Sequence, residues 1–171
     1  MLPLYIVTMV TFVKTTPMKF IKIFVMLLVC SMVFMGCPYS AEIALDAEPA
    51  VKIDNRLIGT YQKSDTKYIV TKSSDLLYKI VEKSEEEETN YMGFLSKIGE
   101  ATFLNIYEAN ASNRQYYFYK VEIVEGGNVE LHPLTTNIKE TFTTSAELKS
   151  FVTKYKDLSF FYDMTETYVK E

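Results

Sequence analysis

The residue types that most often carry chemistry are sparse in this chain. His132 is its one histidine and stands beside Pro133 at an expected strand end. A histidine base for nucleophilic catalysis needs an activated Ser or Cys beside it, and no Gly-x-Ser-x-Gly motif occurs. A zinc site usually takes several His or Cys ligands. We therefore expect His132 to be an ordinary surface or half-buried residue.

Carboxylates are the other chemical group that the sequence gathers. Glu85 to Glu88 are four consecutive glutamates. Neighbouring glutamates do not converge on one cation, and the spaced ligands and central Gly of a calcium loop are missing. We expect a solvated acidic loop, no catalytic residues, no metal and no cofactor, and thus a non-enzymatic protein. A carboxylate-based hydrolase is the alternative, because acid pairs can come together from distant strands.

The two cysteines belong to an apolar segment near the N-terminus. Lys19 and Lys22 precede an uncharged run over residues 23–35, which ends in Gly36 and Cys37. This layout is typical of an export signal. The uncharged run has thirteen residues, whereas a helix that crosses a bilayer core needs about 20. Residues 1–36 contain three lysines and no acid, the charge asymmetry of a targeting segment.

The end of this segment resembles the signal of bacterial lipoproteins. Gly36 and Cys37 fit that pattern, although Phe34 and Met35 are bulky where smaller residues are usual. Ordinary signal cleavage would also want a small residue in place of Phe34. The resemblance implies cleavage after Gly36 and lipidation, such as a palmitate chain, on Cys37. It also implies an envelope location, with the outer membrane favoured because Pro38 replaces the Asp that can retain lipoproteins at the inner membrane.

These signals divide the chain into three parts. Residues 1–36 are the expected signal peptide, and residues 1–17 fit either an erroneous upstream start or a long n-region. Residues 37–56 are expected to hold the lipidated Cys and a tether, because they are small, acidic and without a firm period. Residues 57–171 form one β-rich domain.

The charge of the mature chain restricts its partners. Residues 37–171 carry 15 basic and 22 acidic side chains, a net charge of −7. Nucleic-acid binding needs clustered positive charge, so that class is excluded. Attachment to a membrane is expected through the acyl chains alone. No cysteine follows Cys37, so the exported domain has no disulfide.

The mature chain is built mostly of short β-type runs. Turn signals separate them at Gly99-Glu100 and Gly126-Gly127-Asn128. In residues 76–83 the better inward set is Leu76, Tyr78, Ile80 and Glu82. The expected strands are residues 59–62, 68–71, 76–83, 91–98, 102–108, 114–125, 129–134, 158–162 and 165–169.

One amphipathic helix is expected late in the chain. Thr144 and Glu147 have the spacing of a capping box. An apolar stripe then recurs at helical spacing and should dock on the barrel's outer wall or across one mouth. Its members are Leu148, Phe151, Val152 and Tyr155.

About eight short strands and one helix predict a mainly β (β-rich α+β) fold. We expect an antiparallel barrel or a strongly bent sheet, since closure removes exposed strand edges. The outline weakly resembles lipocalin-like proteins, which are eight-stranded barrels with Gly-x-Trp in the first strand and a late helix. Gly59-Thr60-Tyr61 stands in the corresponding place, with Tyr61 where Trp is expected.

Tyrosines supply the best candidates for a binding face. The mature chain has 12 Tyr and 7 Phe, and a tyrosine offers a large apolar ring with a polar tip. Tyr116, Tyr117 and Tyr119 are our first candidates, although tyrosines in strands also serve as barrel wall. We expect a binding domain for a small apolar ligand or a partner protein. A structural or assembly lipoprotein with a filled core and no ligand is the alternative.

Replacing Cys37 by Ser tests the lipid attachment. Two or three acyl chains anchor strongly, at about 0.8 kcal/mol per buried CH₂. We expect the Cys37→Ser protein to leave the membrane fraction or to persist as an uncleaved precursor, as measured by fractionation and intact mass. A variant that is cleaved and fractionates like the wild type would contradict lipidation.

Overall fold

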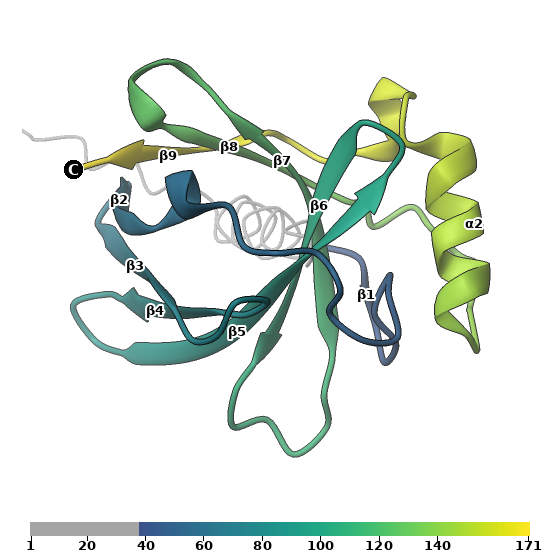
Figure 1. The fold of residues 1–171 in the computed structure, drawn as a ribbon, viewed down its shortest axis with the longest axis horizontal. Coiled ribbons are helices and arrows are strands. Elements are labelled where there is room, and N and C mark those ends of the chain that lie inside the picture. The colour runs from purple at the N-terminus through teal and green to yellow at the C-terminus, as the bar shows by residue number, and fades with distance from the viewer. Residues whose placement is uncertain (1–37) are drawn as a thin grey trace, which may run out of the picture. The chain divides into compact units, whose positions relative to one another are not determined.

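Eight antiparallel strands close into a barrel in the computed structural model, which describes residues 38–171 (Figure 1). Neighbours in sequence pair with one another from β2 to β8, β9 pairs with both β2 and β8, and so no barrel edge is left open. The expected barrel is thereby confirmed. Its strands are β2 (Gly59–Lys63), β3 (Thr66–Lys72), β4 (Tyr78–Lys83), β5 (Glu88–Ile98), β6 (Ala101–Glu108), β7 (Tyr116–Ile123), β8 (Val129–Pro133) and β9 (Glu166–Lys170).

Tight turns set the register of the long hairpins. Gly99 between β5 and β6 has φ +63°, and Gly126 and Gly127 between β7 and β8 have φ +75° and +81°. These left-handed angles are nearly free of strain only for glycine. Gly126 and Gly127 belong to a short 3₁₀ turn, η3 (Glu125–Gly127). Both turns stand where the sequence predicts them.

One expected strand is wrong. Residues 158–162 form a 3₁₀ turn, η4 (Ser159–Phe161), and only Tyr162 makes a single bridge, to Leu134. The reason is packing: the turn directs Phe161, which is 3% exposed, into an apolar cluster outside the barrel. The barrel is closed instead by β9, within the run expected at 165–169.

Alternation along the strands divides the apolar side chains into two cores. In β4, Tyr78, Ile80 and Glu82 face the interior as predicted, whereas Leu76 precedes the strand. An inner cluster fills part of the barrel and includes Leu57, Tyr61, Leu95, Leu104 and Leu131. An outer cluster lies against the other side of the wall and includes Leu45, Ile98, Phe103, Phe118 and Leu134.

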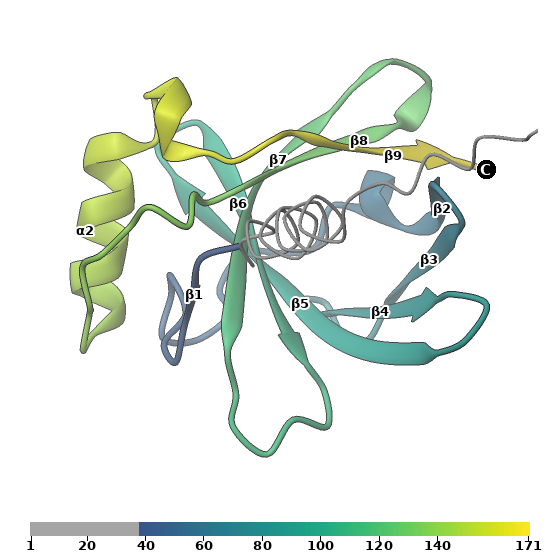
Figure 2. The same ribbon diagram turned by 180° about the vertical axis from the view of Figure 1, so that it is seen from behind.

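Helix α2 (Ser145–Tyr155) covers this outer cluster. Thr144 and Glu147 form the predicted capping box, and Leu148 and Val152 are fully buried among Phe103 and Phe118. Figures 1 and 2 show α2 standing beside the barrel wall, so the helix takes the first of its two expected positions. Among residues 38–171 no helix is long and apolar enough to cross a membrane.

The segment 38–56, expected to be a tether, packs on the barrel instead. Ser40 and Ala41 form β1 (Ser40–Ala41), which pairs with β7, and Leu45 is fully buried. The buried Asn105 amide accepts a hydrogen bond from the Leu45 N–H (3.0 Å) and donates one to Ser96 Oγ (2.9 Å). The composition of the segment resembles a linker, but its few apolar residues supply part of the outer core. Residues 38–171 thus contain both cores and every barrel pairing.

Truncating the buried side of α2 tests the outer core. Leu148→Ala should lower the free energy of unfolding by about 2–5 kcal/mol, because it removes a fully buried side chain. Ser150→Ala, on the exposed side of the same helix, should change it by less than about 0.5 kcal/mol. Urea denaturation measures both. Equal and small losses would mean that α2 is not part of the core.

Candidate functional site

The barrel interior holds a cavity of about 430 Å³. Aliphatic side chains such as Ile80, Leu104 and Leu131 form much of its wall. Cavities of this size are within the range that holds a small organic molecule. Seven tyrosines also line it: Tyr61, Tyr68, Tyr78, Tyr91, Tyr117, Tyr119 and Tyr168.

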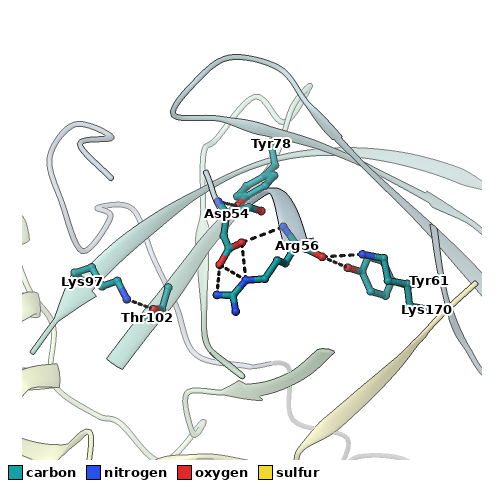
Figure 3. Close-up of polar contacts among 7 residues, drawn as sticks. All are labelled: Asp54, Arg56, Tyr61, Tyr78, Lys97, Thr102 and Lys170. Carbon is teal, nitrogen blue, oxygen red and sulfur yellow. Dashed lines mark hydrogen bonds and ion pairs between the residues drawn. The ribbon is translucent and has the colours of Figure 1, made fainter. Parts of the chain in front are cut away.

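A short 3₁₀ turn, η2 (Asn55–Leu57), and the Asp54 before it are hydrogen-bonded to side chains of β2, β4 and β9 (Figure 3). The inward Tyr78 hydroxyl accepts a hydrogen bond from the Asp54 N–H (2.6 Å) and donates one to the Asp54 carbonyl (3.1 Å). The Tyr61 hydroxyl donates to the Arg56 carbonyl at 3.3 Å. Both rings rise from the barrel interior, so these bonds hold η2 over its end, with Leu57 directed into the cavity.

Lys170 at the end of β9 completes this closure. Its Nζ donates to the Arg56 carbonyl at 2.8 Å and lies 5.5 Å from the centre of the Tyr61 ring (Figure 3). A Cβ on Gly59 would come within 2.7 Å of Lys170 Cε, and Gly59 has φ +154°. The Gly59-Thr60-Tyr61 tripeptide therefore leaves room for the lysine chain and supplies the ring beneath its charge.

The other end of the cavity is polar. Lys63 Nζ lies 2.6 Å from Glu166 Oε2, and the Tyr168 hydroxyl donates to the same oxygen at 2.7 Å. Lys63 Nζ is also 5.2 Å from the centre of the Tyr168 ring. An ammonium group thus contacts a carboxylate and an aromatic ring together.

A second carboxylate site lies beside the first. The Tyr68 hydroxyl donates to Glu82 Oε1 at 3.0 Å, and the Tyr68 ring meets the Tyr168 ring edge to face, with centroids 5.0 Å apart. Burial, followed by the neighbouring Glu82 charge, raises the pKa of Tyr68, and the same causes raise the pKa of Tyr91 to about 12. Both phenols therefore stay protonated and can donate to carboxylates at neutral pH.

The structure places the three candidate tyrosines on both sides of β7. Tyr117 and Tyr119 line the cavity, but Tyr116 points to the opposite side of β7 and meets Phe94 and Tyr107 edge to face. Strand alternation explains this, since residues one apart face opposite sides. The cavity residues of β3, β5 and β9 were missed, although the same alternation could have indicated Tyr68 and Tyr91.

His132 lies on the outer wall, away from the cavity residues of β8. Its Nδ1 is 2.9 Å from Thr165 Oγ1, and its Nε2 is 3.7 Å from a Glu122 oxygen. Glu130 stands opposite Glu122 in the β7–β8 pairing, and Lys120 Nζ lies 2.6 Å from Glu122. The ion pair of this group is Lys120–Glu122, and His132 lies half-buried beside it on the outer wall. The run from Glu85 to Glu88 is exposed, as expected of a solvated loop.

Comparisons with protein-family models, with curated proteins and with solved structures find no match to this chain. The chemistry of the cavity is therefore the main indication of what the protein binds. The cavity is largely apolar and is covered by η2 at one end. Its other end is lined by carboxylates, tyrosines and one lysine.

The buried tyrosines predict a loss of stability in alkali. Burial raises the pKa of Tyr78 and Tyr91 to about 12, against about 10 in an unfolded chain. Their contribution is complete below pH 10 and is lost as the pH rises from about 10 to about 12, because the unfolded chain releases these protons first.

An absorbance titration of tyrosinate, run beside circular dichroism, measures this effect. We expect a group of tyrosines to ionise only as the protein unfolds, whereas all of them ionise near pH 10 in concentrated urea. Complete ionisation near pH 10 with the fold intact would contradict the burial.

Proposed function

We propose that this protein is a non-enzymatic binding protein that holds one small, largely apolar ligand inside its barrel while an N-terminal lipid attaches it to a membrane of the cell envelope. The observation that supports ligand binding most directly is the cavity of about 430 Å³. A barrel of eight strands is just wide enough to be filled by its own side chains or to hold one small ligand.

The cavity favours a ligand over the alternative of a structural lipoprotein with a filled core. Large residues do line the interior, but they leave a chamber with apolar walls, as ligand sites usually do. Its polar groups are gathered at the end opposite η2, where β2, β4 and β6 reach their turns. An amphiphile could place its polar group there and its apolar body toward Leu57.

Two observations support a position at a membrane surface. Pro38 lines the cavity, so an acyl chain on Cys37 would be attached one residue from the barrel rather than through a long tether. Phe160, 71% exposed, lies within η4, and Met164, 87% exposed, follows that turn. The Phe161 carbonyl of η4 accepts a hydrogen bond from the Thr135 N–H. The Tyr39 N–H donates to the adjacent Leu134 carbonyl, so this apolar loop lies near the attachment point.

A carboxylate-based hydrolase is less well supported than a binding protein. The two half-buried cavity glutamates, Glu82 and Glu166, already accept hydrogen bonds from tyrosines, and Glu166 is also paired with Lys63. Both carboxylates are therefore already bound by donors from within the barrel, as expected of groups that hold the wall together or position a ligand. Hydrolysis of a generic ester or glycoside that Glu82→Gln abolishes would overturn the non-enzymatic proposal.

Filling the cavity tests ligand binding. The domain of residues 38–171 should bind decanol, a neutral ten-carbon alcohol, in a calorimetric titration. Ile106→Trp replaces an aliphatic cavity residue with a bulky indole ring. It should weaken decanol binding about tenfold or more, because the ring occupies the space of the ligand.

Val169→Trp is the matched control. It places the same ring at a position that is 52% exposed outside the barrel, and it should bind decanol like the wild type. Circular dichroism reports whether each variant folds. Undetectable binding by the wild type, or equal binding by a folded Ile106→Trp domain, would contradict the proposal.

A further inference from the structure

The charges of the cavity are unbalanced. Three glutamates line it, Glu82, Glu108 and Glu166, against one lysine, Lys63. Lys63 forms a salt bridge with Glu166, with 2.6 Å between Lys63 Nζ and Glu166 Oε2. Within residues 38–171 no lysine or arginine forms a salt bridge with Glu82 or Glu108, which leaves the polar end with two more negative than positive charges.

The Lys63 contacts show what this environment accommodates. Its ammonium lies beside the Glu166 carboxylate and 5.2 Å from the centre of the Tyr168 ring. Both contacts are favourable for a cation, the first by charge and hydrogen bonding and the second by the ring quadrupole.

Glu82 has the same surroundings without a lysine. The Tyr68 hydroxyl donates to one Glu82 oxygen, as the Tyr168 hydroxyl does to Glu166, and the two rings touch. Tyr91, another cavity residue, approaches Glu82 closely enough for the carboxylate to raise the pKa of its phenol. A carboxylate can accept about four hydrogen bonds, so Glu82 retains capacity for a further donor.

We propose that the ligand is a cationic amphiphile, an organic amine whose ammonium group binds Glu82 between the rings of Tyr68 and Tyr91 and whose apolar body extends toward Ile80 and Leu104. This inference rests on the proposed ligand-binding function and specifies its chemistry. Glu108, exposed at the rim, adds attraction for a cation entering the cavity. An anionic amphiphile would be repelled by the Glu82 and Glu108 carboxylates and is disfavoured.

A ligand series with one tail and three head groups tests the charge preference. Decylamine, decanol and decanoate are titrated calorimetrically into the domain of residues 38–171 at neutral pH, where the amine is a cation and the acid an anion. We expect decylamine to bind about tenfold tighter than decanol, and decanoate to bind weakest. Added salt should reduce the advantage of the amine, because screening weakens charge pairing near a surface.

Two matched variants locate the preference. Glu82→Gln removes the charge and keeps the shape, so the affinity ratio of decylamine to decanol should fall to about one. Glu130→Gln removes the same charge from the outer wall, where strand alternation places it, and should keep the wild-type ratio. If Glu82→Gln does not fold, Glu108→Gln should still lower the ratio.

The outcomes separate this inference from the function on which it rests. If decanol and decylamine bind equally well, the cavity binds ligands but the inference about charge is overturned. Tighter binding of decanoate, or a folded Glu82→Gln domain that keeps its preference, also overturns it. If none of the three compounds binds, the proposed function itself fails.

Discussion

The structure depends on the closure of one sheet upon itself. β9 pairs with β2 on one side and β8 on the other, so each of the eight barrel strands has a paired strand on both sides. Successive side chains of a strand point to opposite faces of the sheet. Because the sheet is closed, one of these faces lines the enclosed interior and the other faces outward. The two cores of the domain follow from this division.

The outer side of the barrel wall packs against other segments of the chain, whereas the inner side lines a cavity. The outer side buries α2 and the segment around Leu45, and the Asn105 amide joins that segment to β5 and β6 by hydrogen bonds. Because this outer core supplies packed apolar contacts, the interior does not have to be filled completely. The inner side can therefore retain a chamber that is closed by η2 and lined by tyrosines.

Much of the fold was predictable because local signals agreed. The glycine turns, the capping box of α2 and the alternation of β4 and β7 each require only nearby residues. Three features were not predictable in this way. The packing of Leu45 depends on a partner 60 residues away, the turn at Phe161 depends on the outer core, and linker-like composition concealed the β1 pairing.

The site was predicted less well than the fold for a related reason. Tyr117 and Tyr119 were found because they lie in one conspicuous strand, whereas the carboxylate sites join residues from different strands. Tyr68 and Glu82 become neighbours through the β3–β4 register, and Lys63 and Glu166 meet only because β9 returns to β2. Such pairs require the closed topology, which single strand patterns do not contain.

Under the proposed function, ligands enter the barrel interior and do not bind beneath α2. Methyl NMR spectra of residues 38–171, recorded while decylamine is added, test this claim directly. We predict that the methyl signals of the cavity residues Ile80, Leu104 and Val121 shift progressively until the binding site is saturated. The methyl signals of Leu45, Leu148 and Val152 in the outer core should not shift. Shifts confined to the outer set would contradict the account.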